Sequence, residues 1–110
     1  MKKMQKNSEQ EALSPACAMF ERFGSRWALL VLLTLSERGV LRFSELRRAV
    51  PGDVSERMLT ATVRDLGEAG LVVRTVYPEV PPRVEYGLTP KGESLVPHLK
   101  SLLRWAEDNA

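Results

Sequence analysis

The sequence predicts a small α+β domain that is mainly α-helical and carries one β-hairpin, and three observations support this class. Apolar residues recur at helical spacing through most of the chain. Gly39 and Gly70 directly follow two of these segments, where glycine commonly ends a helix. Between residues 71 and 88, the β-prone segments "LVVRTVY" and "RVEYGL" are joined by the proline-rich loop "PEVPP", which is typical of a hairpin with a rigid tip.

The composition is that of one globular domain. Of the 110 residues, 44% are hydrophobic and 27% are charged, and this length fits a single core. The net charge of +2 permits nucleic-acid binding but does not indicate it.

The same composition argues against a membrane or secreted protein. The longest apolar run, "WALLVLLTL" at residues 27–35, is shorter than the roughly 20 residues of a membrane span, so we expect no membrane partner. The N-terminus lacks the apolar segment of a secretory signal. A single cysteine, Cys17, excludes an intramolecular disulfide and fits a cytoplasmic protein.

Two helices are predicted in the first third of the chain. Residues 1–14 lack apolar periodicity and are expected to form a flexible tail, which leaves one domain over residues 15–108. A first helix should begin near Pro15, and a second, from Arg26 to Arg38, is apolar almost all round, as expected of a central core helix. The apolar stripe of the first helix consists of Ala16, Met19, Phe20 and Phe23.

Residues 40–69 predict a short strand and two helices joined by a tight turn. "VLRF" is β-prone and leads into "SELRRAV", a helix of about two turns. "PGDV" is a turn, and Ser55 is a good N-cap for a helix that runs to about Ala69. Leu59, Val63 and Leu66 share one face of this helix, which we expect to be buried.

The last helix is more apolar than one small domain requires. It should begin at Thr89 and Pro90, which suit the N-cap and first helical positions. Its apolar residues cover about half of the circumference, whereas one domain needs a stripe of roughly 100°, so we expect a second subunit to cover the excess. Pro97 should kink this helix or delay its start. The apolar residues are Leu95, Val96, Leu99, Leu102, Leu103, Trp105 and Ala106.

No constellation of residues indicates catalysis. His98 is the only histidine and lies among leucines, without the cysteines or second histidine of a zinc site. Cys17 has no histidine close in sequence, and no glycine-rich phosphate loop follows a strand. We therefore expect neither enzymatic activity nor a cofactor.

Two helices joined by a tight turn and followed by a β-hairpin form a winged helix-turn-helix. In this architecture the second helix enters the major groove of double-stranded DNA and the hairpin, or wing, lies over the flanking backbone. The prolines of the tip would reduce the entropy that the loop loses on binding.

The chain resembles the HxlR-type family of bacterial and archaeal winged-helix transcription regulators over roughly residues 15–108. The resemblance rests on Cys17, on "GSRWALLVLLTL", on "RFSELRRAVPGDVSERMLTATVRDLGEAGLVVRTVYPEVPPRVEYGLTPKG", and on "LLRWAED". It implies a homodimer that binds palindromic operator DNA near its own or neighbouring genes, more often as a repressor than as an activator. It also implies that the first and last helices, at the N- and C-terminal ends of the domain, form the dimer contacts.

The second helix of the motif provides the main candidates for base contacts. Arg57 and Arg64 lie on its outer side, where an arginine can bind a guanine edge through two hydrogen bonds. Thr60 or Ala61 can contact a thymine methyl. The alternative is a solvated face on which Arg64 pairs with Glu68.

Further DNA contacts are expected at the helix starts and in the wing. Arg83, at the base of the wing, could reach a phosphate or the minor groove; the alternative is a pair with Glu79 or Glu85. Many relatives carry a larger polar or basic pair where this chain has Ala61 and Thr62, which indicates fewer base contacts and more reliance on DNA shape. The candidates at the two helix starts are Arg42, Ser44 and Ser55.

Cys17 has two interpretations. Some members of the family sense electrophiles or oxidants through a cysteine at this position, and a helix start favours the reactive thiolate. Alternatively, Cys17 is a small buried hydrophobic residue; relatives often have proline next, whereas Ala18 follows here. With one cysteine, oxidation would join two subunits or attach a small thiol.

A second class of function also fits this fold. Some winged helices bind other proteins and do not contact DNA. That function predicts an acidic or apolar recognition face, and the outward arginines of the second helix argue against it.

Overall fold

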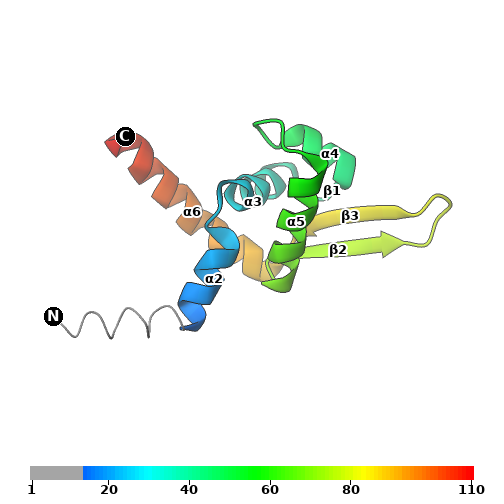
Figure 1. Ribbon diagram of the computed structural model, residues 1–110, viewed down its shortest axis with the longest axis horizontal. Helices are drawn as coiled ribbons and strands as arrows, with labels where there is room; N and C mark the ends of the chain where they lie inside the picture. Colours follow the sequence, from blue (N-terminus) through cyan, green and yellow to red (C-terminus); the bar gives the residue numbers. More distant parts are fainter. Residues whose placement is uncertain (1–13) are drawn as a thin grey trace.

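The computed structural model describes residues 14–110, and in this part of the chain it has five helices and three strands (Figure 1). The predicted class, mainly helical with a small sheet, is confirmed. The expected tail lies outside the described residues except for Ser14. In chain order the elements are α2 (Pro15–Phe23), α3 (Arg26–Arg38), β1 (Leu41–Arg42), α4 (Phe43–Ala49), α5 (Glu56–Glu68), β2 (Val72–Tyr77), β3 (Arg83–Leu88) and α6 (Pro90–Asn109).

Hydroxyl side chains cap four of the helices. Ser55 accepts a hydrogen bond from the N–H of Met58 at 3.0 Å, and Thr89 accepts one from Gly92 at 3.0 Å, as the sequence predicted. Ser14 and Ser25 cap α2 and α3 in the same way. Each cap satisfies a backbone N–H that the helix itself cannot pair, and this determines where these helices begin.

The core is built around α3. Val31 and Leu32 of α3 are completely buried, as are Leu46 of α4 and Leu59 and Leu66 of α5. Helix α3 also contacts α2, α6 and β3, so the expected central helix is confirmed.

The sheet has three antiparallel strands in the order β1-β3-β2. The hairpin β2–β3 was predicted, but the pairing of β1 with β3, which places Leu41 opposite Tyr86, was not. The hairpin extends well beyond the helices as a wing, on the side opposite the C-terminal end of α6 (Figure 1).

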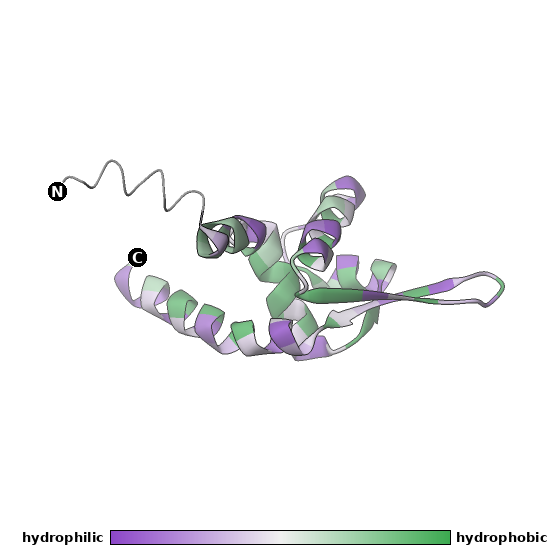
Figure 2. Ribbon diagram, turned by 90° about the horizontal axis from the view of Figure 1, so that it is seen from below, coloured by the Kyte–Doolittle hydropathy of each residue, from purple (hydrophilic) through white to green (hydrophobic). Residues whose placement is uncertain are grey.

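Helix α6 continues through Pro97. The helix begins at Pro90, as Thr89 and Pro90 predicted, so of the two alternatives for Pro97 the delayed start does not occur. The ribbon of α6 curves (Figure 2). Proline removes the hydrogen bond to the carbonyl four residues earlier, that of Glu93. Pro97 and Glu93 are both exposed, so water can replace this bond and the helix continues.

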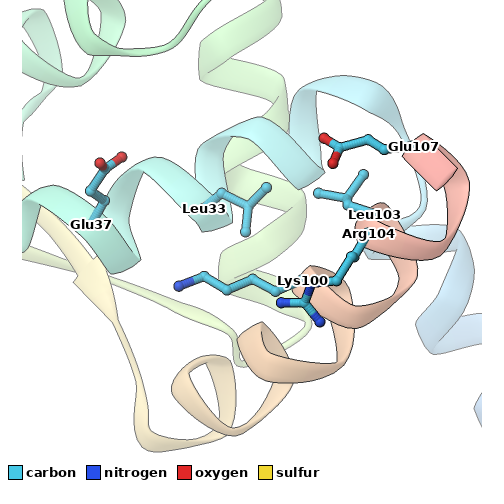
Figure 3. Close-up of a pocket in the computed structure, with 6 residues that line it drawn as sticks. All are labelled: Leu33, Glu37, Lys100, Leu103, Arg104 and Glu107. Carbon is cyan, nitrogen blue, oxygen red and sulfur yellow. The ribbon is translucent and has the colours of Figure 1, made fainter.

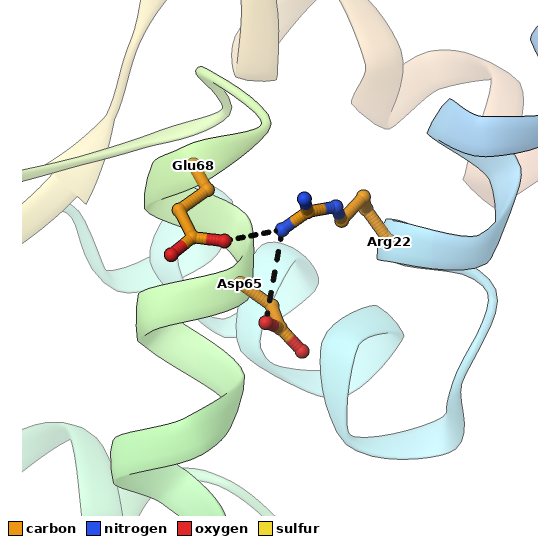
Figure 4. A network of polar contacts seen from close by, with 3 residues as sticks. All are labelled: Arg22, Asp65 and Glu68. Carbon is orange, nitrogen blue, oxygen red and sulfur yellow. Dashed lines mark hydrogen bonds and ion pairs between the residues drawn. The ribbon is translucent and has the colours of Figure 1, made fainter. Parts of the chain in front are cut away.

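Helix α2 packs on the domain through an ion pair with α5 (Figure 4). Nη1 of Arg22 lies 2.6 Å from a carboxylate oxygen of Glu68 and 3.7 Å from one of Asp65. The hydrogen bond from Arg22 holds the pKa of Glu68 below its ordinary value. The predicted stripe of α2 is only partly covered, because Phe20 remains 57% exposed.

Gly92 forms the joint between α6 and the start of β2. It is buried, and a Cβ atom at this position would overlap the carbonyl oxygen of Leu71. That carbonyl cannot easily move, because it accepts a hydrogen bond from the N–H of Thr89 at 3.1 Å. Thr89 also donates its hydroxyl to Gly70, at 2.6 Å. Position 92 therefore has no room for any side chain.

Replacing Gly92 with alanine should destabilise the fold. We expect Gly92→Ala to lower the free energy of unfolding by about 1–3 kcal/mol, the usual cost of overpacking a rigid site. Urea denaturation followed by circular dichroism measures this. The matched control is Gly67→Ala in α5, where the Cβ would lie 3.7 Å from the nearest atom, the carbonyl oxygen of Val72. The control should be neutral or stabilising, and equal stability of Gly92→Ala and wild type would contradict the close approach.

Candidate nucleic-acid interface

The turn between α4 and α5 holds the two helices of the motif in a fixed orientation. Gly52 has φ +98° and Asp53 has φ 59°, a conformation that glycine and aspartate tolerate better than most residues. Nε of Arg47 donates to the carbonyl oxygen of Val54 at 2.9 Å. Val50 and Val54 are buried at either end of the turn. The predicted turn is thus anchored to the core on both sides.

The outer side of α5 is polar and exposed. Arg57, Thr60 and Arg64 are exposed on it, and Ala61 beside them is half-buried. The opposite face, Leu59, Val63 and Leu66, is buried as predicted. Helical periodicity therefore brings the four candidate residues for base contacts to one surface.

The structure rejects one alternative for this surface. Arg64 makes no pair with Glu68, because the carboxylate of Glu68 is bonded to Arg22. Neither Arg57 nor Arg64 forms an ion pair with any residue in the range 14–110. Their guanidinium groups are free to bind an external anion.

Thr62 does not contribute to this outer surface. It is 7% exposed, and its hydroxyl donates to the carbonyl oxygen of Met58 at 2.8 Å. Of the Ala61–Thr62 pair, only Ala61 can reach a ligand on the outside of α5.

The candidates at the helix starts have local roles as well. The Ser55 hydroxyl is the N-cap of α5, and the N–H of Arg42 donates to the carboxylate of Glu45 at 2.8 Å. The side chains of Arg42 and Ser44 are exposed at the start of α4. No ion pair holds Arg42 within the described part of the chain.

Arg83 is engaged within the wing. Its guanidinium nitrogens lie 3.2 Å from a carboxylate oxygen of Glu79 and 3.5 Å from one of Glu85, and its Cζ lies 4.1 Å from the ring centroid of Tyr77. The alternative to a DNA contact, pairing with these two acids, is therefore what the structure shows. The side chain is only 29% exposed, so a contact between Arg83 and DNA would need these pairs to open.

Arg74 of β2 is a cationic wing residue that sequence reasoning missed. Directly opposite residues of two antiparallel strands share a face, and faces alternate along each strand. Arg74 lies opposite the buried Tyr86, whereas Tyr77 lies opposite Arg83 on the other face. Arg74 thus faces α5. Because side chains alternate between the two faces of a strand, Arg74 must share the face of the apolar Val72, two residues earlier. The sequence alone could have shown this.

Arg74 and α5 enclose a cavity of about 390 Å³. Arg64 lies across it on α5, so the structure brings two arginines distant in sequence to one crevice. The residues that line the cavity are Thr60, Val63, Arg64, Gly67, Glu68, Val72, Arg74 and Tyr86.

The remaining candidate residues lie away from this surface. Cys17 is half-buried in the first turn of α2, where its N–H donates to the Ser14 hydroxyl at 3.1 Å. Within residues 14–110, no three or more histidine, cysteine, aspartate or glutamate side chains gather as a metal site. In the same range no helix is long and apolar enough to cross a membrane.

Comparison with known proteins agrees with this geometry. The family model for HxlR-like helix-turn-helix proteins matches residues 22–110. A relative from Methanothermobacter thermautotrophicus, an uncharacterised HTH-type transcriptional regulator, is 48% identical over 99 residues, which cover 90% of this chain and 74% of that protein.

Two solved redox-related structures share the fold. The redox regulator HypR in its reduced form is 38% identical, with a TM-score of 0.75 over 87% of this chain and 93% of that chain. Diamide-treated YodB from B. subtilis is 32% identical, with a TM-score of 0.73 over 87% of this chain and 94% of that chain. Together with the exposed arginines of α5 beside a wing, these matches show that the chain belongs to the HxlR-like helix-turn-helix family of DNA-binding transcriptional regulators, which are not enzymes.

Proposed function

We propose that this chain is a cytoplasmic, homodimeric repressor that binds palindromic operator DNA through α5 and the wing. The observation that carries the proposal is the pair of exposed arginines on α5, Arg57 and Arg64, neither of which forms an ion pair within residues 14–110. Arg74 adds a third such charge from the wing. A protein that occupies DNA in this way blocks access of the transcription machinery to the same site.

Within this proposal, α5 makes few base contacts. Arg57, in the first turn, binds a guanine edge, because the early residues of a recognition helix lie deepest in the groove. The small side chain of Ala61 and the buried Thr62 leave little else to distinguish bases. Operator choice then depends also on the phosphate backbone and on DNA shape. Arg42, Ser44 and Ser55 are proposed backbone contacts.

The rival function, a protein-binding winged helix without DNA contact, is less well supported. An acidic or apolar recognition surface would favour it. The exposed surface of α5 instead carries arginines, with the acids Asp65 and Glu68 turned toward Arg22 of α2.

The proposed dimer rests on apolar surface that the single chain leaves uncovered. Trp105 and Leu102 of α6 are 63% and 55% exposed, and Phe20 of α2 is 57% exposed. Green, apolar segments recur along α6 until its hydrophilic, purple C-terminal end (Figure 2). Leu29, Leu30 and Leu33 of α3 are also only half-buried.

A groove between α3 and α6 fits a second copy of this chain. It has a volume of about 450 Å³, with Leu33 and Leu103 at its floor and charges of both signs around it (Figure 3). Symmetric interfaces bring the same surface of each subunit together, so mixed charge around an apolar floor can complement itself. The charged lining residues are Glu37, Lys100, Arg104 and Glu107.

Sensing of electrophiles or oxidants through Cys17 is the regulatory part of the proposal. Cys17 lies on α2, one of the proposed dimer helices, and it is half-buried rather than sealed in the core. HypR and YodB, both similar to this chain, were solved in reduced and in oxidised or diamide-treated forms. Two Cys17 thiols of different subunits, or one and a small thiol, would lose two electrons to the oxidant and form a disulfide.

The DNA-binding proposal is tested by gel shift with the DNA upstream of the chain's own gene. We expect Arg57→Ala to weaken binding by about 1–3 kcal/mol, roughly 5- to 150-fold, since it removes a bidentate base contact. Wild-type affinity should fall steeply between roughly 50 and 200 mM salt. Lys91→Ala removes the same charge from the first turn of α6, outside α5, the wing and the groove between α3 and α6, and should leave affinity unchanged.

The gel shift and a reporter-gene assay each have an outcome that would contradict part of the proposal. Absence of wild-type binding at low salt would favour the protein-binding rival. A reporter gene placed behind the bound site should lose expression when the protein is supplied, and a rise would show an activator.

The dimer is tested by sedimentation velocity. We expect Trp105→Ser to raise the dimer dissociation constant at least about tenfold, because aromatic residues at the centre of an interface dominate its affinity. Val80→Ser is the matched control, since Val80 is an apolar residue that is 100% exposed at the wing tip. A Trp105→Ser protein that dimerises like wild type would show that α6 is not the interface.

Treatment with diamide tests the role of Cys17. The wild-type protein should release DNA on oxidation and bind DNA again after addition of dithiothreitol. The Cys17→Ser protein should stay bound to DNA throughout. Non-reducing electrophoresis identifies whether subunits become crosslinked. An equal response of both proteins would make the cysteine structural.

A further inference from the structure

The cavity between α5 and the wing combines an apolar floor with two unpaired cations. Val63 of α5, Val72 of β2 and the ring of Tyr86 of β3 provide the apolar surface. Gly67 leaves the end of the cavity open, because only the carbonyl oxygen of Val72 comes within 4 Å of a Cβ built there. At about 390 Å³, the cavity lies within the size range of small-molecule sites, roughly 300–1,000 Å³.

The charges around this cavity favour an anion. Arg64 and Arg74 line it, and neither pairs with an acid within residues 14–110. Glu68 is the one acid in the lining, and its carboxylate is bonded at 2.6 Å to Arg22, outside the cavity. Because Arg22 offsets the charge of Glu68, the surroundings of the cavity are positive on balance.

We propose that this cavity binds a small aromatic carboxylate and that binding releases the protein from DNA. The ring lies against Val63, Val72 and Tyr86, and the carboxylate accepts hydrogen bonds from Arg64 and Arg74. Arginine binds carboxylates in a bidentate, charge-assisted manner, and an adjacent apolar floor selects a planar hydrophobic acid over inorganic anions.

The release of DNA follows from the shared use of Arg64. The same guanidinium cannot bind a ligand carboxylate in the crevice and a DNA phosphate or base at full strength. A ligand that binds the free protein better than the DNA complex must lower DNA affinity by the same factor by which DNA lowers ligand affinity. This second half of the proposal rests on the proposed DNA-binding function; ligand binding itself does not.

Binding of the carboxylate to the cavity is tested first, with the full chain and without DNA. 2-Naphthoate is titrated while amide signals are followed by NMR, and 2-naphthamide serves as the uncharged analogue. We expect naphthoate to shift the signals of Gly67 and Val72, and the amide to bind at least tenfold more weakly. Arg74→Gln should weaken naphthoate binding at least tenfold. Arg38→Gln, at the C-terminal end of α3, should not change it, because Arg38 lines neither this cavity nor the groove between α3 and α6.

A second variant fills the cavity without removing charge. Gly67→Leu should keep the far-ultraviolet spectrum of wild type and lose naphthoate binding, because its side chain fills the open end of the cavity. Equal binding of naphthoate and naphthamide, retained binding in both Arg74→Gln and Gly67→Leu, or no wild-type binding at millimolar naphthoate would each overturn the site.

The proposed release of DNA by the ligand is tested by the gel shift. Naphthoate should release wild-type protein but not Gly67→Leu from DNA. If naphthoate binds but DNA affinity does not fall, the ligand site stands and the proposed release of DNA is wrong. Naphthoate binding by a protein that never binds DNA would count against the proposed function alone.

Discussion

The fold is organised by the burial of α3 among the other elements. Val31 and Leu32 are inaccessible to water, and each buried aliphatic side chain of this kind contributes about 1.5–3 kcal/mol. Helices α4 and α5 bury Leu46, Leu59 and Leu66 against the same core. Because α5 must turn these apolar residues inward, Arg57 and Arg64 point outward. The cationic surface is therefore a consequence of how the core is packed.

The distribution of ion pairs decides which charges remain available. Arg22 of α2 binds the acids of α5, which leaves Arg64 unpaired beside them. In the wing the opposite occurs, because Glu79 and Glu85 hold Arg83. Arg74 on the other face of the hairpin has no such partner and adds its charge to α5. A small net charge of +2 can thus still produce a locally cationic surface.

The uncovered apolar surface and the cationic surface lie at opposite ends of the molecule. Trp105 and Leu102 are exposed toward the C-terminal end of α6, while the wing extends in the other direction (Figure 1). This separation allows the proposed dimer to form while both wings and both α5 helices stay accessible. Half-buried Cys17 lies on α2, one of the helices proposed to form the dimer, so the proposed oxidation would act on the arrangement of the subunits.

Features that depend on short-range interactions could be predicted from the amino-acid sequence. The bounds of α3, the N-caps Ser55 and Thr89, and the buried face of α5 follow from neighbours within a few residues. Contacts between distant segments could not be predicted in this way: Leu41 beside Tyr86, Arg22 on Glu68, and Arg74 facing α5. Local periodicity shows which way a side chain points but does not identify its partner. For that reason the outward arginines were predicted, and the pairing of Arg83 with Glu79 and Glu85 was foreseen only as an alternative to a DNA contact. The position of Arg74 was missed.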